Sequence, residues 1–241
     1  MQTDRIFSQQ AVGAGEFSFD ENVANVFDDM INRSVPLYAD VQRVIPLLIG
    51  GLQQDPVRIV DFGCSTGTSL IHLAQALPNR NLDLIGVDNS QPMLEKFNEK
   101  LEALNLQGSS NVVCADIQSF EFTDASVVLM NYTLQFIQPE DRLTMLQRIR
   151  QRLQPGGFLL LSEKVSHAQE GMDKLLTEQY FDFKRRNGYS ELEIARKRDA
   201  LENVLVPLTV DQNIELLTQA GFEKVEVLLK WFNFTTLMAT L

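Results

Sequence analysis

The sequence is poor in cysteine and histidine, and this shortage excludes several classes of protein. It has 2 of each in 241 residues, with no Cys-x-x-Cys pair and no Cys/His cluster. Neither a disulfide scaffold nor a metal site is expected, and Cys64 and Cys114 are predicted to be separate reduced thiols of a cytoplasmic protein. No stretch approaches the roughly 18 uncharged apolar residues of a membrane-spanning helix, and MQTDRIFSQQ at the start lacks the pattern of a signal peptide. No association with a membrane is expected.

Basic side chains are also scarce relative to acidic ones. The 21 Lys and Arg residues are outnumbered by 32 Asp and Glu, which gives a formal net charge of −11. Proteins that bind RNA or DNA unaided neutralise phosphates with Lys and Arg, so this balance argues against direct nucleic-acid binding. A small acidic substrate is not excluded, because a single buried arginine can bind a carboxylate whatever the net charge.

What the sequence does contain is an alternation of short apolar runs and helical patterns from Val57 onward. The apolar runs are typical of strands buried on both faces, and the patterns between them predict helices. This alternation predicts right-handed β-α-β units and a doubly wound, mostly parallel sheet. Strands are expected at 58–63, 82–88, 111–116, 125–133 and 157–163, and helices at 69–77, 90–104 and 138–153.

Three further regions complete what is expected to be a single domain around this 57–163 core. Residues 1–56 are predicted to form a helical leader. Residues 164–206 are predicted to form a polar, helical insertion. Residues 207–241 are expected to hold a helix followed by two strands that separate near Trp231.

The stretch DFGCSTGTSL (61–70) joins the first strand to the first helix of the core and predicts a ligand-binding turn. It follows the carboxyl end of a strand, where open α/β sheets bind ligands. Its D-x-G-x-x-x-G spacing is neither the G-x-G-x-x-G that seats a pyrophosphate nor a P-loop. We expect Gly63 and Gly67 to let the backbone pass close to a ligand and to adopt dihedral angles that side chains disfavour.

Polar residues at the ends of the following strands strengthen this prediction. Asp88 ends the second strand roughly 20 residues beyond the turn, where such folds bind ribose hydroxyls; alternatively it caps the next helix, a role open to Ser90. Asp116 is suited to accept a hydrogen bond from an adenine amino group while Ile117 packs on the ring, and Asn131 ends the fourth strand. Without a pyrophosphate motif, this combination describes S-adenosyl-L-methionine, which has adenine, ribose and an amino-acid tail but no phosphate.

The insertion places an arginine on an apolar helix face. In YSELEIARKRDALENVLV, three apolar residues share one face at helical spacing: Ile194, Leu201 and Leu205. Arg198 falls on the same face, and burying a guanidinium there requires an anionic partner. Two interpretations stay open, an arginine that reaches solvent or pairs within the chain, and a clamp for a carboxylate. Arg196 and Lys197 lie off this face and are expected to be solvated.

Residues 57–163 and the terminal hairpin resemble the class I S-adenosylmethionine-dependent methyltransferases. Within that superfamily, FSFDENVANVFDDMINRSVPLY, DFGCS, VDNSQPM, NYTLQF, LSEK and DFKRRNGYSELEIARKRDALENV are similar to the carboxy-S-adenosyl-L-methionine synthase family. The resemblance implies a Rossmann-like, seven-stranded sheet that ends in an antiparallel hairpin. It also implies that S-adenosyl-L-methionine and prephenate give carboxy-S-adenosyl-L-methionine and phenylpyruvate. It further implies that the product passes to a tRNA carboxymethyltransferase, which forms uridine-5-oxyacetic acid at the wobble position.

The same resemblance assigns roles to individual residues. Arg198 takes the catalytic role of binding the new carboxylate, and is implied to act in the neighbouring protomer's site of a homodimer. Glu163 and Tyr189 are expected to support the site. The remaining matches are expected to bind the cofactor: Tyr38, Gly63, Cys64, Ser65, Asp88, Asn89, Asp116, Ile117 and Asn131. An ordinary methyltransferase acting on a small molecule or tRNA is the alternative, and an inactive cofactor-binding protein is a third possibility.

Overall fold

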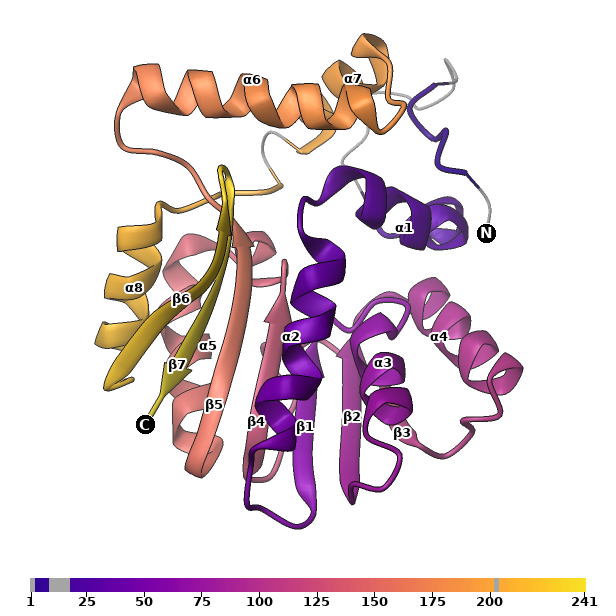
Figure 1. Cartoon of the computed structure of the whole chain (residues 1–241), viewed down its shortest axis with the longest axis vertical. Helices are drawn as coiled ribbons and strands as arrows, with labels where there is room; N and C mark the ends of the chain where they lie inside the picture. The colour runs from indigo at the N-terminus through magenta and orange to yellow at the C-terminus, as the bar shows by residue number, and fades with distance from the viewer. Residues whose placement is uncertain (1–2, 9–17, 202–203) are drawn as a thin grey trace.

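A computed structural model, which describes residues 3–8, 18–201 and 204–241, has a seven-stranded sheet between two layers of helices (Figure 1). The strand order is β3-β2-β1-β4-β5-β7-β6. β1 to β5 run parallel, while β7 pairs antiparallel with both β5 and β6. The predicted fold class is confirmed. The strands are β1 (Val57–Phe62), β2 (Leu82–Asp88), β3 (Ser110–Cys114), β4 (Ala125–Asn131), β5 (Leu153–Lys164), β6 (Lys224–Trp231) and β7 (Phe234–Thr240).

Helices cover both faces of the sheet. On one face, Ile45, Leu70 and Phe97 from three different helices pack in a core cluster with strand residues. On the other face, Leu146 and Leu217 belong to a second cluster. The helices against the first face are α2 (Tyr38–Gly50), α3 (Thr68–Ala76) and α4 (Gln91–Ala103), and those against the second are α5 (Pro139–Arg152) and α8 (Val210–Gln219).

The position of each strand in the sheet explains its composition. β4 lies in the middle and is buried along its length except for its last residue, so ASVVLM shows no alternation of apolar and polar residues. β6 lies at the edge, is partly exposed, and carries charged residues between its apolar ones in KVEVLLKW. Charged side chains on an edge strand oppose pairing with other chains.

Three helices lie above the carboxyl ends of the parallel strands (Figure 1). They are α1 (Glu21–Ser34) from the leader, and α6 (Glu170–Arg186) and α7 (Glu191–Leu201) from the insertion. Distant segments are joined there by several hydrogen bonds, including the following two. The Tyr180 hydroxyl donates to the Ser34 carbonyl (3.0 Å), and the Asn187 side chain donates to the Arg33 carbonyl (3.1 Å). None of the described helices is long and apolar enough to cross a bilayer.

The predicted elements are confirmed, with three differences at strand ends. β3 ends at Cys114, so Asp116 lies in the turn beyond it. β4 ends at Asn131 because Tyr132 has a φ of 61°, outside the range of extended strands. β5 begins early, at Leu153, and crosses the Pro-Gly-Gly sequence with a shift of its register against β4.

Candidate active site

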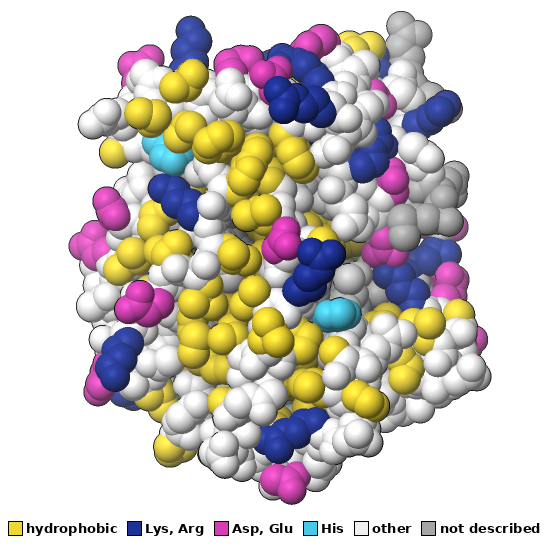
Figure 2. Space-filling model, viewed as in Figure 1, with side chains coloured by type: hydrophobic (Ala, Val, Ile, Leu, Met, Phe, Trp, Pro, Cys, Tyr) yellow, Lys and Arg dark blue, Asp and Glu magenta, His cyan; other side chains and the backbone are white. Residues whose placement is uncertain are grey.

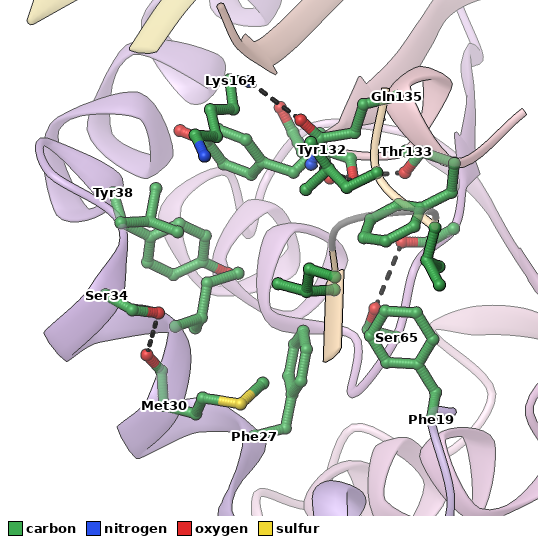
Figure 3. Close-up of a pocket in the computed structure, with 18 of the residues that line it drawn as sticks. Phe19, Phe27, Met30, Ser34, Tyr38, Ser65, Tyr132, Thr133, Gln135 and Lys164 are labelled. Atoms are coloured by element: carbon green, nitrogen blue, oxygen red, sulfur yellow. Dashed lines mark hydrogen bonds between the residues drawn. The ribbon is translucent and has the colours of Figure 1, made fainter. Parts of the chain in front are cut away.

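A cavity of 590 Å³ lies between the strand ends and the helices above them (Figure 3). We call the β1–α3 turn and the ends of β2 and β4 its floor, and α1, α6, α7, residues 204–207 and Lys164 at the end of β5 its roof. The volume is typical of small-molecule sites. All ten predicted site residues line this one cavity: Tyr38, Gly63, Cys64, Ser65, Asp88, Asn89, Asp116, Ile117, Asn131 and Arg198.

The turn between β1 and α3 depends on two glycines. Gly63 has a φ of 72° and Gly67 a φ of 75°, so the predicted dihedral angles are confirmed. The space beside them is filled by protein and is not left for a ligand. A Cβ on Gly63 would lie 2.4 Å from Thr133 Oγ1, and one on Gly67 would lie 2.0 Å from the Phe97 ring. Backbone conformation and side-chain packing therefore both require glycine here.

Asp88 organises this turn from the end of β2. Its Oδ2 accepts a hydrogen bond from Ser65 N–H and its Oδ1 accepts one from Ser90 N–H, both at 2.9 Å. The cap of α4 is Ser90, whose hydroxyl accepts from Met93 N–H, so Asp88 does not cap the helix. Burial raises the pKa of Asp88, and the backbone hydrogen bonds oppose this shift. Each oxygen keeps capacity to accept a further bond from a ligand.

The turn after β3 forms the rim of the floor. Asp116 is exposed, and its Oδ1 accepts from Gln118 N–H at 2.9 Å. Ile117 is half-buried and lines the cavity beside it. The guanidinium of Arg148 donates to the carbonyl groups of both Ile117 and Gln118. The turn is thus held by α5, with one carboxylate and one apolar side chain at the cavity edge.

Asn131 at the end of β4 has a fixed orientation. Its Oδ1 accepts from the Ser162 hydroxyl at 2.9 Å, and its Nδ2 donates to the Ser69 hydroxyl at 3.4 Å. Both ends of the amide are thereby engaged by neighbouring elements. A side chain held in this way is preorganised for a ligand.

Asp61 is a lining residue that the sequence analysis did not select. It is 2 % exposed, and its carboxyl has no hydrogen bond or ion pair with the residues that the structure describes. Burial, followed by the nearby charge of Asp88, raises the pKa of Asp61 to about 8. A buried carboxyl without a partner, at the wall of a cavity, favours a cationic ligand group. Its position two residues before Gly63 was the available sequence signal.

Aromatic side chains form much of the cavity wall (Figure 3). The Tyr132 ring lies 6.4 Å from that of Tyr38 and 6.2 Å from that of Phe234, and Phe19 lies 5.6 Å from Phe136. Burial raises the pKa of both Tyr38 and Tyr132. Their hydroxyl groups are therefore neutral at physiological pH, in a wall that limits the access of water.

Arg198 lines the cavity from α7 but is not buried. Its side chain is 60 % exposed, and Nε and Nη2 pair with Asp199 Oδ1 at 3.0 and 2.8 Å. The predicted apolar face holds for Ile194, which is buried, but not for Arg198, which was expected to be buried beside it. α7 ends at Leu201, which leaves Leu205 outside the helix. The choice between an arginine paired within the chain and a carboxylate clamp stays open on this geometry.

Lys197 was expected to be solvated, and this prediction is wrong. It is 7 % exposed, and its Nζ donates to Ser34 Oγ at 3.4 Å. The reason is that the buried side of α7 consists of Glu193, Ile194 and Lys197. Burial lowers the pKa of Lys197 to about 8. Arg196 is also only half-exposed, and donates to the Phe7 carbonyl at 2.9 Å.

Two more lysines of the roof escaped the sequence analysis. Lys184 is 4 % exposed and Lys164 is half-buried, and both line the cavity. Their Nζ atoms lie 4.8 and 5.5 Å from the centroid of the Tyr180 ring. Burial lowers the pKa of both, and that of Lys184 is lowered further by Lys197 and Lys164. The roof therefore holds basic groups that a bound anion would keep protonated, and the floor holds carboxyl groups that a bound cation would keep ionised.

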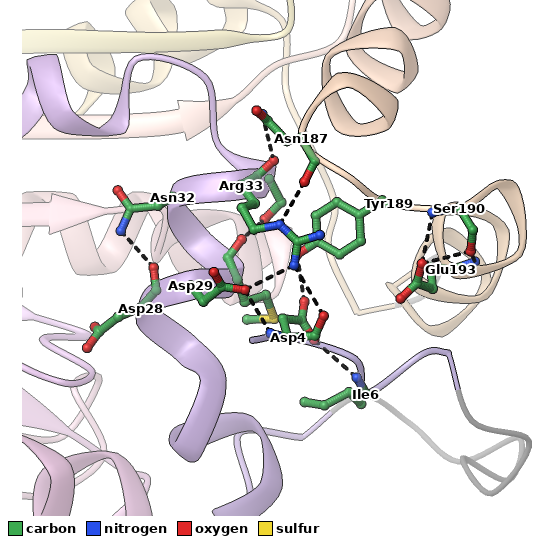
Figure 4. A network of polar contacts seen from close by, with 12 residues as sticks. Asp4, Ile6, Asp28, Asp29, Asn32, Arg33, Asn187, Tyr189, Ser190 and Glu193 are labelled. Atoms are coloured by element: carbon green, nitrogen blue, oxygen red, sulfur yellow. Dashed lines mark hydrogen bonds and ion pairs between the residues drawn. The ribbon is translucent and has the colours of Figure 1, made fainter. Parts of the chain in front are cut away.

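A polar network ties the leader to the insertion (Figure 4). Arg33 donates from Nε to the Asn187 carbonyl at 2.7 Å and from Nη1 to Asp29 Oδ2 at 3.0 Å. Its guanidinium lies 4.2 Å from the centroid of the Tyr189 ring. The Tyr189 hydroxyl donates to Asp4 Oδ2 at 2.6 Å. Tyr189 does not line the cavity, and it holds the roof to the leader instead.

Glu163 supports the floor from below. It is 3 % exposed, and its Oε1 accepts from Leu134 N–H at 3.1 Å. Burial raises the pKa of Glu163 to about 8, and the nearby Arg142 opposes this shift. The contact fixes the short 3-10 helix η1 (Leu134–Phe136), which follows Asn131. Glu163 therefore positions the end of β4 without touching the cavity.

The sheet order, the terminal hairpin and a cavity at the strand ends define the methyltransferase class of α/β proteins, and comparisons agree. The family model described as "Methyltransferase domain" matches residues 59–157. The structure of an O-methyltransferase family protein from Burkholderia thailandensis is similar with a TM-score of 0.69 and 15 % identity, over 95 % of this chain and 65 % of that one. The structure of human N-acetylserotonin methyltransferase in complex with S-adenosylmethionine is similar with a TM-score of 0.59 and 12 % identity, over 91 % of this chain and 55 % of that one. These likenesses show the fold alone.

Whole-chain sequence comparison is more specific. Carboxy-S-adenosyl-L-methionine synthase from Methylococcus capsulatus is 45 % identical over 99 % of both chains. The proteins of that name from Photorhabdus laumondii and Haemophilus ducreyi are 42 % and 41 % identical over 99 % of this chain, and over 94 % and 98 % of their own. The chain belongs to the carboxy-S-adenosyl-L-methionine synthase family, and the resemblance found in its motifs is confirmed. It is accordingly an enzyme of the transferase class.

Proposed function

We propose that the protein converts S-adenosyl-L-methionine and prephenate to carboxy-S-adenosyl-L-methionine and phenylpyruvate. One observation carries the proposal. A single cavity joins the strand-end residues suited to S-adenosyl-L-methionine with three lysines suited to anions. Its relatives are named for synthesis of the carboxylated compound, and the electrostatic contrast between floor and roof fits a cationic and an anionic reactant held together.

S-adenosyl-L-methionine lies along the floor in this proposal. Asp88 accepts hydrogen bonds from the ribose hydroxyls, and the free carboxyl of Asp61 receives the ammonium of the methionine part. Both assignments rest on charge and on unused acceptor capacity. The other contacts follow the strand ends. Gly63, Cys64 and Ser65 hold the amino-acid tail, Asn89 the ribose region, Asp116 and Ile117 the adenine, and Tyr38 and Asn131 the reacting end.

The chemistry balances without an added oxidant or base. Prephenate aromatises to phenylpyruvate by breaking its ring carbon–carboxylate bond, which releases carbon dioxide, and its carbon–hydroxyl bond, which releases hydroxide. The hydroxide takes a proton from the sulfonium methyl and becomes water. The resulting ylide attacks carbon dioxide and forms the new carbon–carbon bond. The protein's task is to hold the two reactants together and keep out bulk water, which the aromatic wall is suited to do.

Arg198 binds the new carboxylate in this proposal. A guanidinium is well suited to a carboxylate because it can donate two parallel hydrogen bonds. In a single chain its side chain is 60 % exposed at the cavity. We therefore propose that the working form is a homodimer, in which Arg198 completes the site of the neighbouring protomer.

Exposed apolar side chains support the homodimer. Large hydrophobic residues that are more than a third exposed include Leu47 on α2, Val227 on β6, and Met172 and Leu175 on α6. Figure 2 shows hydrophobic side chains gathered on the face where α2, β6 and β7 lie. Association of two copies would remove such a surface from water. Light scattering of the purified protein tests this, and a monomer at working concentration would contradict it.

We also propose that the product leaves for a tRNA carboxymethyltransferase, which uses it to form uridine-5-oxyacetic acid at the wobble position. The formal net charge of −11 is consistent with a cytoplasmic enzyme that does not itself bind tRNA. Deleting the gene is expected to remove this modification from bulk tRNA. Mass analysis of digested tRNA measures it, and an unchanged level would contradict the assignment.

The decisive experiment is incubation of the purified protein with S-adenosyl-L-methionine and prephenate, followed by mass analysis of the small molecules. We expect S-adenosyl-L-methionine heavier by one carbon dioxide, together with an equal amount of phenylpyruvate. Unmodified S-adenosyl-L-methionine would contradict the proposal. Formation of S-adenosylhomocysteine with a methylated small molecule or tRNA would instead assign ordinary methyl transfer.

A further inference from the structure

Three lysines from one continuous segment of the chain meet at the roof of the cavity. Lys164 ends β5, Lys184 lies in the last turns of α6, and Lys197 lies in α7. Two of their ammonium groups flank the Tyr180 ring, with Lys184 Nζ 4.8 Å and Lys164 Nζ 5.5 Å from its centroid. The third, Lys197 Nζ, donates to Ser34, whose carbonyl accepts the Tyr180 hydroxyl. Lys197 Nζ lies 5.9 Å from the centroid of a second ring, Tyr189, so the cluster lies between two aromatic side chains.

No carboxylate within the described parts of the chain forms an ion pair with this cluster, although the nearby charges of Asp4 and Asp173 favour its protonated lysines. None of the three lysines takes part in an ion pair there. The nearby carboxylate of Asp4 is engaged by the Tyr189 hydroxyl and by a backbone N–H group. Like charges gathered at a buried site destabilise one another unless an anion joins them. The missing anion has room in the cavity that all three lysines line.

The surroundings of the cluster are apolar. Phe234 and Phe181 contact Tyr180, with ring centroids 5.1 and 6.0 Å apart, and both line the cavity. Leu201 and Leu205 line it as well. A ligand suited to this environment carries an anionic group on an apolar body. The cosubstrate of the proposed function has this composition, with one carboxylate on its ring and a second on its pyruvyl side chain.

We propose that Lys164, Lys184 and Lys197 bind the pyruvyl carboxylate, the one that stays in the product, and so orient the ring toward the sulfonium on the floor. This inference rests on the proposed function. The pyruvyl carboxylate is preferred to the ring carboxylate for an electrostatic reason. Cations held against the ring carboxylate would stabilise the charge that departs as carbon dioxide, and would thereby raise the barrier to its loss. Cations held against the retained carboxylate bind the cosubstrate equally before and after that step.

Substitution of the lysines tests this assignment. Lys184→Gln and Lys197→Gln are each expected to raise the KM for prephenate about ten- to a hundredfold, the usual effect of losing a hydrogen bond to a charged group. The Kd for S-adenosyl-L-methionine is expected to change less than about twofold, because the lysines lie on the roof. Lys174→Gln is the matched control, since Lys174 is an exposed residue of α6 that does not line the cavity. Unchanged KM values in both variants would overturn the inference.

Thermal unfolding separates loss of binding from loss of folding. Should Lys184→Gln or Lys197→Gln fail to fold, Lys164→Gln provides the same test, because Lys164 is only half-buried. Lysine-to-arginine substitution at the same position is expected to restore part of the affinity, since it returns the charge. A variant that folds, binds S-adenosyl-L-methionine normally and keeps its KM for prephenate would overturn the assignment of that lysine.

Phenylpyruvate distinguishes the two carboxylates because it keeps only the pyruvyl one. We expect it to compete with prephenate, and its Ki to rise in the glutamine variants by the same factor as the KM. Benzoate, which carries only a ring carboxylate, is expected to inhibit weakly and equally in all variants. If the KM rises while the Ki for phenylpyruvate does not, the lysines bind the departing carboxylate and the inference is wrong.

The proposed function and this inference fail in different ways. If the wild-type protein forms no carboxylated product, the proposed reaction is wrong. Calorimetric binding of phenylpyruvate to the protein loaded with S-adenosyl-L-methionine then still tests the lysines, with Lys184→Gln as the comparison. Equal affinity of wild type and variant in that measurement would overturn the inference on its own.

Discussion

The floor and the roof of the cavity differ in how their side chains come together. The floor consists of strand ends, and the order of parallel strands brings Asp61, Asp88 and Asn131 to one edge of the sheet. The roof consists mainly of helices outside the sheet, which meet because the leader and the insertion pack on each other. Topology therefore determines the floor, while contacts between distant segments determine the roof. Substitutions in the floor and in the roof should therefore differ in their effects on stability, on catalysis and on ligand binding.

The largest expected effect is on the floor. Gly67→Ala should lower the free energy of unfolding by about 2–4 kcal/mol, because the new Cβ would overlap Phe97 in a conformation that side chains disfavour. Gly108→Ala is the matched control, since Gly108 has a similar φ of 79° with nothing within 4 Å of its added Cβ. Denaturant unfolding measures both. Equal losses in the two variants would mean that packing against Phe97 contributes nothing.

The next effect concerns the mouth of the cavity. Arg198→Ala should lower kcat/KM for carboxylation about 10- to 100-fold, because it removes charge-assisted hydrogen bonds to the new carboxylate. Arg198→Lys should recover only part of this loss, because an ammonium cannot replace the two-pronged contact. Arg186→Ala, at an exposed position of α6 that does not line the cavity, is the control. Full activity of Arg198→Ala would refute the clamp assignment.

A smaller effect concerns the proton that Asp61 is expected to release when S-adenosyl-L-methionine binds. The raised pKa of Asp61, about 8, means that its carboxyl is mostly protonated at pH 7 in the free protein. A bound cation favours the carboxylate and lowers this pKa, so binding of S-adenosyl-L-methionine should release a proton. Affinity should then rise with pH and level off above about pH 8.

Calorimetry in buffers of different ionisation enthalpy measures that release. Asp61→Asn should abolish it and weaken binding of S-adenosyl-L-methionine about tenfold, since an amide cannot carry the charge. Glu99→Gln, at an exposed position of α4, should leave both quantities unchanged. Proton release that persists in Asp61→Asn would assign the titration to another group.

The smallest expected effect tests how the roof is held. Tyr189→Phe removes the hydrogen bond to Asp4 and should lower the free energy of unfolding by about 1 kcal/mol. Hydrogen exchange should quicken in α7 while β4 stays protected. Thr218→Ala, which removes an exposed hydroxyl on α8, should leave α7 unchanged. Equal exchange in wild type and Tyr189→Phe would show that other contacts hold the roof.

The floor could be predicted from the sequence because its signals are local. A strand, a glycine turn and a helix start appear together in DFGCSTGTSL, and Asp88 and Asn131 end their strands as expected. The family resemblance added the remaining positions, which all line the cavity. Asp61 was missed because a carboxylate beside a glycine turn is ordinary, and its lack of a partner is visible only in three dimensions.

The roof could not be predicted because helical periodicity does not say which side of a helix is covered. On α7 the apolar spacing selected the Arg198 side, whereas packing against the leader buries the side with Lys197. The contact with Ser34 joins residues that are remote in sequence. Nothing in the sequence pattern distinguishes Lys164 and Lys184 from solvent-exposed lysines, because their approach to the Tyr180 ring depends on the tertiary structure.

All three roof lysines fall within 164–197, a stretch that begins as the last parallel strand ends. In the proposal above, the lysines that hold the second reactant lie in one appendage, while the sheet keeps a fold shared with other methyltransferases. New chemistry on such a scaffold would then need that appendage together with the leader on which it packs. A chimaera in which a related transferase receives both segments would be the corresponding experiment in protein engineering.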